Sequence, residues 1–505
     1  MPFLAQYTIR SKQSYIFRTN HLVEIVGGSD IISKTFDELF ACMKAAGLRY
    51  EQARDQSAGF SMRETRRRFQ EGTLDAAELF IGGGNDTILF RDIDAFRQAN
   101  AAYTRKVLER YPGLLPLCVG VEVEGADYRA DYQKLMDAAE KSKSAMQSGR
   151  VENAQPFARQ DRSTLQAVSV EVRHGDGSVE YRSAEVDAKY SVGVESENTE
   201  EETKLLDDLA KNGERSLLAI VHADGNNMGF KIQKKLGTNT DYDICVNTMR
   251  AFNREIDDVF TKKGPEALEA RRRKLADEFP DDKAKNRLVR WIVKGGDDAT
   301  FICNAKYALE LTKAYLQGVS AAGSQAGEYS SCAGICVFHA HYPFARAYEL
   351  AEQACDNAKK PVHKTHQEQA WLDFHYLRSG VNGDLEDIRE LHRTEECIAR
   401  PWFVCGAQPP DGVFRLDQLN KLDTLLRNAG VKRSQIKDFG TELEVSRHAG
   451  ELVWKRICYN AQKAPNLNAD VKCLFSNSQD ALFKALYDLS DFYDLWFERG
   501  GDEDG

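Results

Sequence analysis

The sequence predicts an α+β fold built from two ferredoxin-like copies, followed by a C-terminal helical domain. Two observations carry this prediction. The order strand, helices, hairpin, helix, strand, helix occurs twice, and the two Gly-Gly hairpin tips, at Gly83-Gly84 and Gly295-Gly296, lie 212 positions apart. Beyond residue 362 the apolar residues recur mainly at helical spacing. A repeat of this length in fixed order indicates a duplicated domain.

The second copy has the clearer pattern. An opening strand, 217–223, is followed by Asp224, and two strand-like runs flank Gly295-Gly296-Asp297-Asp298. Glycine supplies the positive φ of a tight hairpin turn, so these runs predict a hairpin. The remaining elements expected here are strands 289–293, 299–303 and 331–338 and helices 306–320 and 342–360. The pattern favours helices on one face of each sheet.

The first copy repeats these elements with fewer acidic residues. Its expected elements are strands 5–10, 77–81, 87–90 and 114–123 and helices 92–109 and 128–146. The offset of 212 places Lys12 opposite Asp224, Asn85 opposite Asp297 and Asp86 opposite Asp298. This asymmetry indicates one metal-binding copy and one that has kept only the fold.

Four segments follow from this pattern. Residues 1–150 form the degenerate first copy, and 151–215 form a linker with a hairpin around Gly175-Asp176-Gly177. Residues 216–362 form the second copy, with a charged helical insertion before its hairpin. Residues 363–505 are expected to be a helical domain.

Composition restricts the class of protein. A net charge of -10 argues against broad electrostatic binding of nucleic acid. The 11 cysteines contain no C-x-x-C pair, which argues against a zinc ribbon and for reduced thiols in the cytoplasm. Neither a signal peptide nor a membrane-spanning run of apolar residues is expected.

Three carboxylates in the second copy predict the chemistry. Adjacent acids at a hairpin tip repel each other unless a cation neutralises them, and Mg²⁺ (or Mn²⁺) prefers oxygen ligands. We expect Asp224, Asp297 and Asp298 to converge as metal ligands and catalytic residues of phosphoryl or nucleotidyl transfer. For the tip Gly295-Gly296-Asp297-Asp298 alone, the alternative to a metal site is a solvated hairpin turn with two acidic residues.

Other residues of the second copy are nucleotide-binding candidates. The loop Gly225-Asn226-Asn227 leads into a helix whose free N–H groups suit phosphates, although a turn role explains the asparagines equally well. Gly295 and Gly296 allow close approach of a ligand. Lys359 and Lys360 either meet the phosphate tail or cap the end of their helix.

The segments HADGNNMG (222–229) and KGGDDATF (294–301) resemble the palm of the GGDEF/cyclase-like superfamily. More closely, with QSYIFRTNHLVEIVGGSDII (13–32), the GGGND tip, WLDFHYLRSG (371–380) and ARPW (399–402), the chain resembles the two-palm region of the large "Cas ten" subunit of type III CRISPR effectors. The chain lacks a His-Asp dipeptide, so the His-Asp nuclease domain of that family is not expected.

This resemblance implies an enzyme that binds ATP and joins adenylates into a cyclic oligoadenylate, a second messenger of antiviral defence. An RNA trigger and sister effector subunits are implied partners, and a homo-oligomer is an alternative assembly. Two other functions remain: a cyclic dinucleotide synthase, and a silent scaffold that binds RNA or subunits. The first palm would hold the acceptor nucleotide with Gly83, Gly84, Asn85 and Lys12, facing the tip of the second palm.

Overall fold

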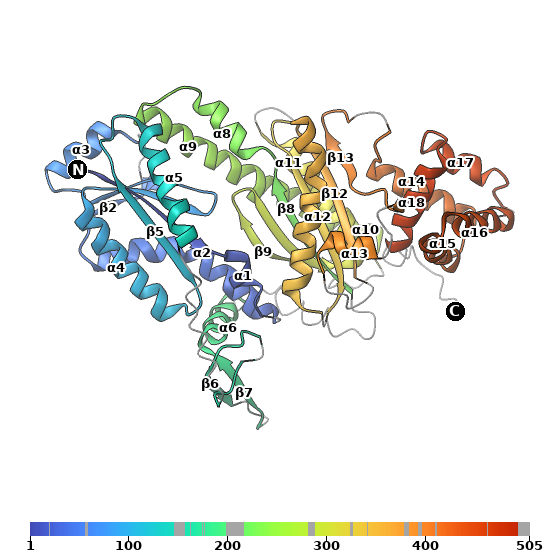
Figure 1. Ribbon diagram of the computed structural model, residues 1–505, viewed down its shortest axis with the longest axis horizontal. Coiled ribbons are helices and arrows are strands. Elements are labelled where there is room, and N and C mark those ends of the chain that lie inside the picture. The colour runs from blue at the N-terminus through green and yellow to red at the C-terminus, as the bar shows by residue number, and fades with distance from the viewer. Residues whose placement is uncertain are drawn as a thin grey trace. The chain divides into compact units, whose positions relative to one another are not determined.

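A computed structural model of the chain describes residues 1–492 except 20, 56–58, 146–156, 162, 174, 176, 198–216, 281–287, 324–326, 341, 378–382, 392–395, 410–411 and 462 (Figure 1). Most of the expected connector after 197 and the last 13 residues therefore lie outside the described residues. The chain divides into two compact units. Unit 1 comprises 1–203, 227–258 and 295–297, and unit 2 comprises 204–226, 259–294 and 298–505.

Unit 1 is built on a five-stranded sheet in the order β2-β3-β4-β1-β5. The strands are β1 (Phe3–Arg10), β2 (Tyr50–Glu51), β3 (Ala76–Gly82), β4 (Asn85–Phe90) and β5 (Leu115–Glu122). The opening strand β1 lies between β4 and β5 and is antiparallel to both. A separate hairpin joins β6 (Val168–Arg173) to β7 (Val179–Ser183), as the sequence predicted for the linker.

Helices cover both faces of this sheet, whereas the sequence predicted one covered face. Tyr7 and Phe90 pack with residues of α2 (Leu22–Ala45) and α4 (Ile93–Arg110) on one side. The other side, represented by Leu79 and Leu89, packs with four further helices. These are α3 (Met62–Gln70), α5 (Tyr128–Ala145), α8 (Met228–Leu236) and α9 (Tyr242–Ile256), so part of the segment assigned to the second copy completes the core of unit 1.

Two short helices and one longer helix complete unit 1. They are α1 (Lys12–Ile16), the 3₁₀ turn η1 (Ala53–Asp55) and α6 (Ala184–Glu197). On α6, the fully buried Lys189 donates to Glu185 Oε1 at 2.8 Å. A buried ammonium needs such a partner, because removing it from water unpaired is costly.

Unit 2 is built on a six-stranded sheet in the order β13-β12-β11-β8-β10-β9. The strands are β8 (Leu217–Gly225), β9 (Val289–Gly295), β10 (Asp298–Asn304), β11 (Ser331–His339), β12 (Gln369–Tyr376) and β13 (Trp402–Gly406). The helices are η2 (Asp257–Lys263), α10 (Gly264–Glu278), η4 (Ala305–Tyr307), α11 (Ala308–Ala321), α12 (Phe344–Thr365), α13 (Leu385–Leu391), α14 (Leu416–Asn428), α15 (Arg433–Val445), α16 (Arg447–Asn460), α17 (Leu467–Cys473) and α18 (Gln479–Phe492).

Strands β12 and β13 correct the expectation that residues beyond 362 are helical throughout. β12 runs parallel to β11, and β13 pairs antiparallel with β12, so these two strands extend the sheet. Ala370, Leu372 and Phe374 are fully buried, and so are Gln369 and Asp373 on the alternate positions. A strand buried on both faces lacks the clear alternation of an edge strand, which hid it in the sequence. The helical prediction holds from α14 onward.

In both sheets the opening strand lies between the second strand of the hairpin and the strand that follows in sequence. The strand registers, however, correct the offset of 212 positions by which the two copies were aligned. In unit 1, Asn85 begins β4 and pairs with Thr8. In unit 2, Asp298 begins β10 and pairs with Asp224. Thr8 and Asn85 therefore stand where unit 2 has its acids. Asp86 is one residue further on and points to the opposite face, because strand side chains alternate.

Asp86 gives a stability prediction for unit 1. It is fully buried, and neither carboxyl oxygen has a hydrogen-bond partner. Burial, followed by the charge of Glu78, raises the pKa of Asp86 well above its ordinary value. Tyr7 and Tyr103 also face it. Since the folded state holds this proton more tightly than the unfolded state, stability is lost as pH rises above about 4.

Asp86→Asn is therefore expected to raise the free energy of unfolding at pH 7 by about 1–3 kcal/mol, because it removes an unpaired buried acid. The gain should vanish below about pH 4, where the wild-type carboxyl is protonated in both states. Urea unfolding at pH 3.5 and pH 7 measures both effects. Equal stability of the two proteins at pH 7 would contradict the prediction.

Candidate active site

The centre of the candidate site is the pair Asp224 and Asp298. Asp224 lies near the end of β8, and Asp298 is its ladder partner at the start of β10. Directly opposite residues of an antiparallel pair point to the same face, with Cβ atoms about 4.5–5.5 Å apart. The strand pairing thus places Asp224 and Asp298 side by side, although 74 positions separate them in the sequence.

Below this pair on the same face lie His222 and Thr300, which are also ladder partners. The His222 Nδ1 and the Thr300 hydroxyl are 3.2 Å apart, and Tyr348 of α12 packs edge-on against the imidazole at 5.5 Å. Burial lowers the pKa of His222 to about 4, so the ring is neutral at pH 7. His222 therefore adds no positive charge beside Asp224.

Positive charge comes instead from Lys359. Its ammonium pairs with Asp224 Oδ2 and lies 3.3 Å from the Gly225 carbonyl. Burial lowers the pKa of Lys359, yet the charge and hydrogen bond of Asp224 outweigh this effect and raise it. Helix α12 continues to Thr365, so Lys359 does not cap the helix end as the alternative interpretation held. Lys360 is exposed on the same helix.

A stripe of α12 faces the acid pair, and the sequence analysis missed most of it. Tyr348, Glu352, Cys355 and Lys359 follow the i, i+4, i+7, i+11 spacing of one helix face. Burial, then the charges of Asp356, Glu349 and Asp224, raise the pKa of Glu352. Glu352 is thus a further carboxyl within the electrostatic reach of Asp224. The helical spacing measured back from Lys359 is the signal that identifies it.

The loop after Asp224 is anchored by Asn226. This side chain is 2% exposed, and its amide nitrogen donates to Ser330 Oγ at 2.8 Å and to the Gln369 carbonyl at 2.9 Å. Both amide hydrogens are therefore committed to the protein, so Asn226 fixes the loop against the start of β12. Asn227 has a left-handed φ of 58° at the start of α8, a conformation that asparagine tolerates.

The hairpin tip that precedes Asp298 consists of Gly296 and Asp297. Gly296 has a φ of 65°, and a side chain added at Gly295 or Gly296 would meet no atom within 4 Å. The tip backbone is therefore open, as expected for glycines that let a ligand approach. Asp297 lies in this turn, next to the ladder pair in sequence.

The acid pair suits a hard divalent cation in chemistry. Two carboxylates stand side by side, with the Gly225 carbonyl near Asp224, and such oxygen donors are what Mg²⁺ prefers. Among the described residues, however, no group of three His, Cys, Asp or Glu side chains is placed to hold a metal ion. The predicted convergence of all three acids thus remains a prediction, and Lys359 neutralises Asp224 here.

In unit 1 the corresponding tip is also glycine-rich. Gly83 and Gly84 have φ values of 56° and 68°, as a type I′ turn requires. Lys12 donates to the Gly84 carbonyl at 2.6 Å, and the Asn85 amide lies 3.2 Å from the Gly83 carbonyl. The structure therefore brings these four predicted residues together around one turn.

Two surface features bear on partners. Arg271, Arg272 and Arg273 of α10 are each paired with a glutamate, which accounts for this basic run as a paired helix surface. Within the described part of the chain, no helix has the length and apolar character needed to cross a membrane.

Comparison with known proteins identifies the segment that holds the acid pair. The family model of Cas10/Cmr2, second palm domain, matches residues 217–367. The search of curated proteins found no match.

Solved structures give remote similarity. A crystal structure of a Csm1-Csm4 cassette in complex with cA4 is 10% identical, with 97% of this chain and 69% of that chain covered and a TM-score of 0.48. The apo Csm1-Csm4 cassette is 12% identical, with 97% of this chain and 69% of that chain covered and a TM-score of 0.49. Csm1 in T. onnurineus is 12% identical, with 85% of this chain and 61% of that chain covered and a TM-score of 0.43. The domain match confirms the resemblance drawn from the motifs: residues 217–367, which hold the Asp224–Asp298 pair and Lys359, match the model of the Cas10/Cmr2 second palm domain.

Proposed function

We propose that the chain is a nucleotidyltransferase that converts ATP to a cyclic oligoadenylate in a type III CRISPR-like defence system. The observation that carries this proposal is the carboxylate pair Asp224–Asp298 at the hairpin of a Cas10/Cmr2 second palm domain. Both acids and a lysine lie on one face beside a helix, an arrangement that can hold a triphosphate. Asp297 is proposed as the third acid of the site.

In the reaction, a ribose hydroxyl oxygen of one nucleotide attacks the α-phosphorus of a bound ATP. A new O–P bond forms, the bond to pyrophosphate breaks, and the hydroxyl proton leaves to solvent. Lys359 would move from Asp224 to the anionic phosphates, because a triphosphate offers it more negative charge. Positioning the hydroxyl in line with the leaving group is a large part of such catalysis.

We propose Mg²⁺ (or Mn²⁺) as the cofactor, held by Asp224, Asp298 and Asp297. When bound, the ion would neutralise phosphate charge and favour departure of pyrophosphate. Glu352, whose pKa is raised, would stay outside the set of ligands and shape the field around Asp224.

We propose further that unit 1 is a degenerate palm that presents the acceptor nucleotide with Lys12, Gly83, Gly84 and Asn85. The Lys12–Gly84 contact supports this role, because it places a cation at the glycine turn. RNA as a trigger, sister effector subunits and a homo-oligomer are the partners that this function would require or permit.

One observation favours a silent scaffold as a second candidate. The Lys359 ammonium occupies the carboxylate that a metal would need. Incubation of the purified protein with each nucleoside triphosphate and Mg²⁺ or Mn²⁺, followed by mass spectrometry, separates the candidates. Cyclic oligoadenylate supports the proposal, and a cyclic dinucleotide supports the alternative product. A scaffold would leave all four nucleotides unchanged, with or without added RNA.

Lys359→Met tests the role of the lysine directly. Without nucleotide, we expect Mn²⁺ to bind roughly tenfold more tightly than to the wild type, the equivalent of about 1.4 kcal/mol, because the competing ammonium is gone. With nucleotide, we expect the KM for ATP to rise, because the phosphates lose a cation. Calorimetry and steady-state kinetics measure the two effects. The exposed neighbour Lys360→Met is the matched control, and unchanged Mn²⁺ affinity in Lys359→Met would contradict the competition.

A further inference from the structure

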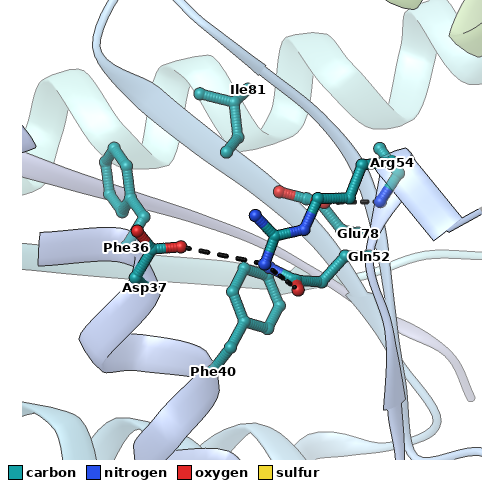
Figure 2. A pocket seen from close by; sticks show the side chains of 8 residues that line it. Phe36, Asp37, Phe40, Gln52, Arg54, Glu78 and Ile81 are labelled. Atoms are coloured by element: carbon teal, nitrogen blue, oxygen red, sulfur yellow. Dashed lines mark hydrogen bonds and ion pairs between the residues drawn. The ribbon is translucent and has the colours of Figure 1, made fainter. Parts of the chain in front are cut away.

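Unit 1 contains a pocket that the proposed reaction does not use. It lies between α2, η1 and β3 and has a volume of about 200 Å³ (Figure 2). Its lining includes Phe36, Phe40, Gln52, Arg54, Glu78 and Ile81. Phe36 and Phe40 are one helical turn apart on α2, so their rings line the same wall.

The polar group of this pocket is Glu78. Glu78 is only 3% exposed, and its Oε2 accepts a hydrogen bond from the Ala53 N–H at 2.5 Å. Oε1 has no hydrogen-bond partner. Figure 2 shows a Glu78 oxygen pointing into the space beside Phe36 and Ile81. A buried acceptor without a partner is rare in folded proteins and calls for an explanation.

The surroundings of Glu78 are acidic as well as aromatic. Buried Asp86 lies close enough for its pKa to be raised by the charge of Glu78, and neither of its oxygens has a partner. Asp37 stands at the rim. Burial likewise raises the pKa of Glu78 above its ordinary value, against the lowering effects of the Ala53 N–H and of Arg250 and Arg54. Carboxylates with aromatic ring faces are the combination that recognises organic cations.

Arg54 is the cation already at the rim. Its side chain is 70% exposed, and its Nη2 lies 2.8 Å from Gln52 Oε1 and 4.0 Å from Asp37 Oδ1. These contacts hold the guanidinium at the mouth of the pocket (Figure 2). An exposed pair of this length is weak, so the side chain can move aside at little cost.

We propose that this pocket binds a small organic cation with N–H donors, such as a guanidinium group, which packs against the wall formed by Phe36 and Phe40 and donates to Glu78 Oε1. Arg54 competes with this ligand at the rim. The positive charge of the ligand would stabilise the buried Glu78 carboxylate. The site is independent of the proposed ATP chemistry, because it lies within unit 1 and needs no metal.

The experiment is calorimetric titration of the full chain with methylguanidinium chloride, in EDTA and without nucleotide. We expect saturable binding that Glu78→Gln weakens at least about tenfold, since a hydrogen bond to a charged group is lost. Arg54→Ala should bind several times more tightly than the wild type.

The controls keep the result specific to this pocket. Glu109→Gln, an exposed glutamate of α4 in the same unit, makes the same charge change and should bind like the wild type. Tetramethylammonium, a cation without N–H donors, should bind more weakly than methylguanidinium. Thermal unfolding shows whether Glu78→Gln is folded, and Arg54→Ala tests the pocket independently of it. No saturable binding in the wild type and Arg54→Ala, or equal binding by folded Glu78→Gln, would overturn the proposal.

Discussion

The double variant Asp224→Asn, Asp298→Asn is expected to lower formation of cyclic oligoadenylate by at least about 100-fold, since loss of outer-shell partners alone costs 10–100-fold. Asparagine keeps the size and polarity of each side chain but removes the charge that would hold a divalent cation. The two residues are ladder partners near the ends of their strands, so the fold should tolerate the change. Mass spectrometry of product from ATP and Mn²⁺ measures the loss.

A matched control tests whether the loss of turnover comes from removing carboxylates in the site or from removing any two negative charges. Asp438→Asn, Asp470→Asn makes the same change at two exposed positions of the helical region and should retain wild-type turnover. Circular dichroism should show the same helix content in all three proteins. Turnover by the site variant within threefold of the wild type would show that the chemistry lies elsewhere.

The sequence predicted the central pair because the motif and the strand order pointed to the same place. An opening strand that ends in Asp224 and a hairpin that continues through Asp298 meet only if the two strands are neighbours, which the repeated order indicated. The exact pairing was beyond the sequence. A shift of one residue moves a side chain to the other face of a strand, and the offset of 212 was wrong by this amount at Asp86.

Other features depended on burial, which the sequence does not display. Asn226 has the composition of a turn residue, yet the structure buries it and commits its amide to Ser330 and Gln369. Glu352 is one of several charged residues on α12, and it comes within electrostatic reach of Asp224 only because α12 packs on β8. Two of the helices that cover the second face of the first sheet, α8 and α9, lie more than 100 residues further along the chain than β5.

A buried ionic network attaches α18 of the C-terminal helical region to the sheet of unit 2. The sequence motifs did not predict this network. Arg400 donates to Asp488 at 3.0 Å and to Asp491 at 2.6 Å, and it also contacts the Phe374 carbonyl of β12. Asp488 also accepts from the Trp402 indole at 2.7 Å. One arginine thus joins β12 and the start of β13 to α18.

Arg400→Met is accordingly expected to lower the free energy of unfolding of unit 2 by about 3–5 kcal/mol, because it leaves two buried carboxylates without their cation. Burial raises the pKa of Asp488 to about 6 even though Arg400 and the Trp402 indole act to lower it, so loss of Arg400 would leave this carboxyl still less able to ionise. The five tryptophans all fall within 291–496, so urea unfolding followed by tryptophan fluorescence reports on unit 2.

The same substitution at the surface provides the comparison. Arg447 pairs with Asp480 at 2.9 Å, but the two side chains are 47% and 62% exposed. Solvent screens such a pair, so Arg447→Met should cost less than about 1 kcal/mol. If Arg400→Met costs no more than Arg447→Met, the buried network does not hold α18 on the sheet, and apolar packing such as Phe374 against Phe492, at 4.3 Å between ring centroids, must do so instead.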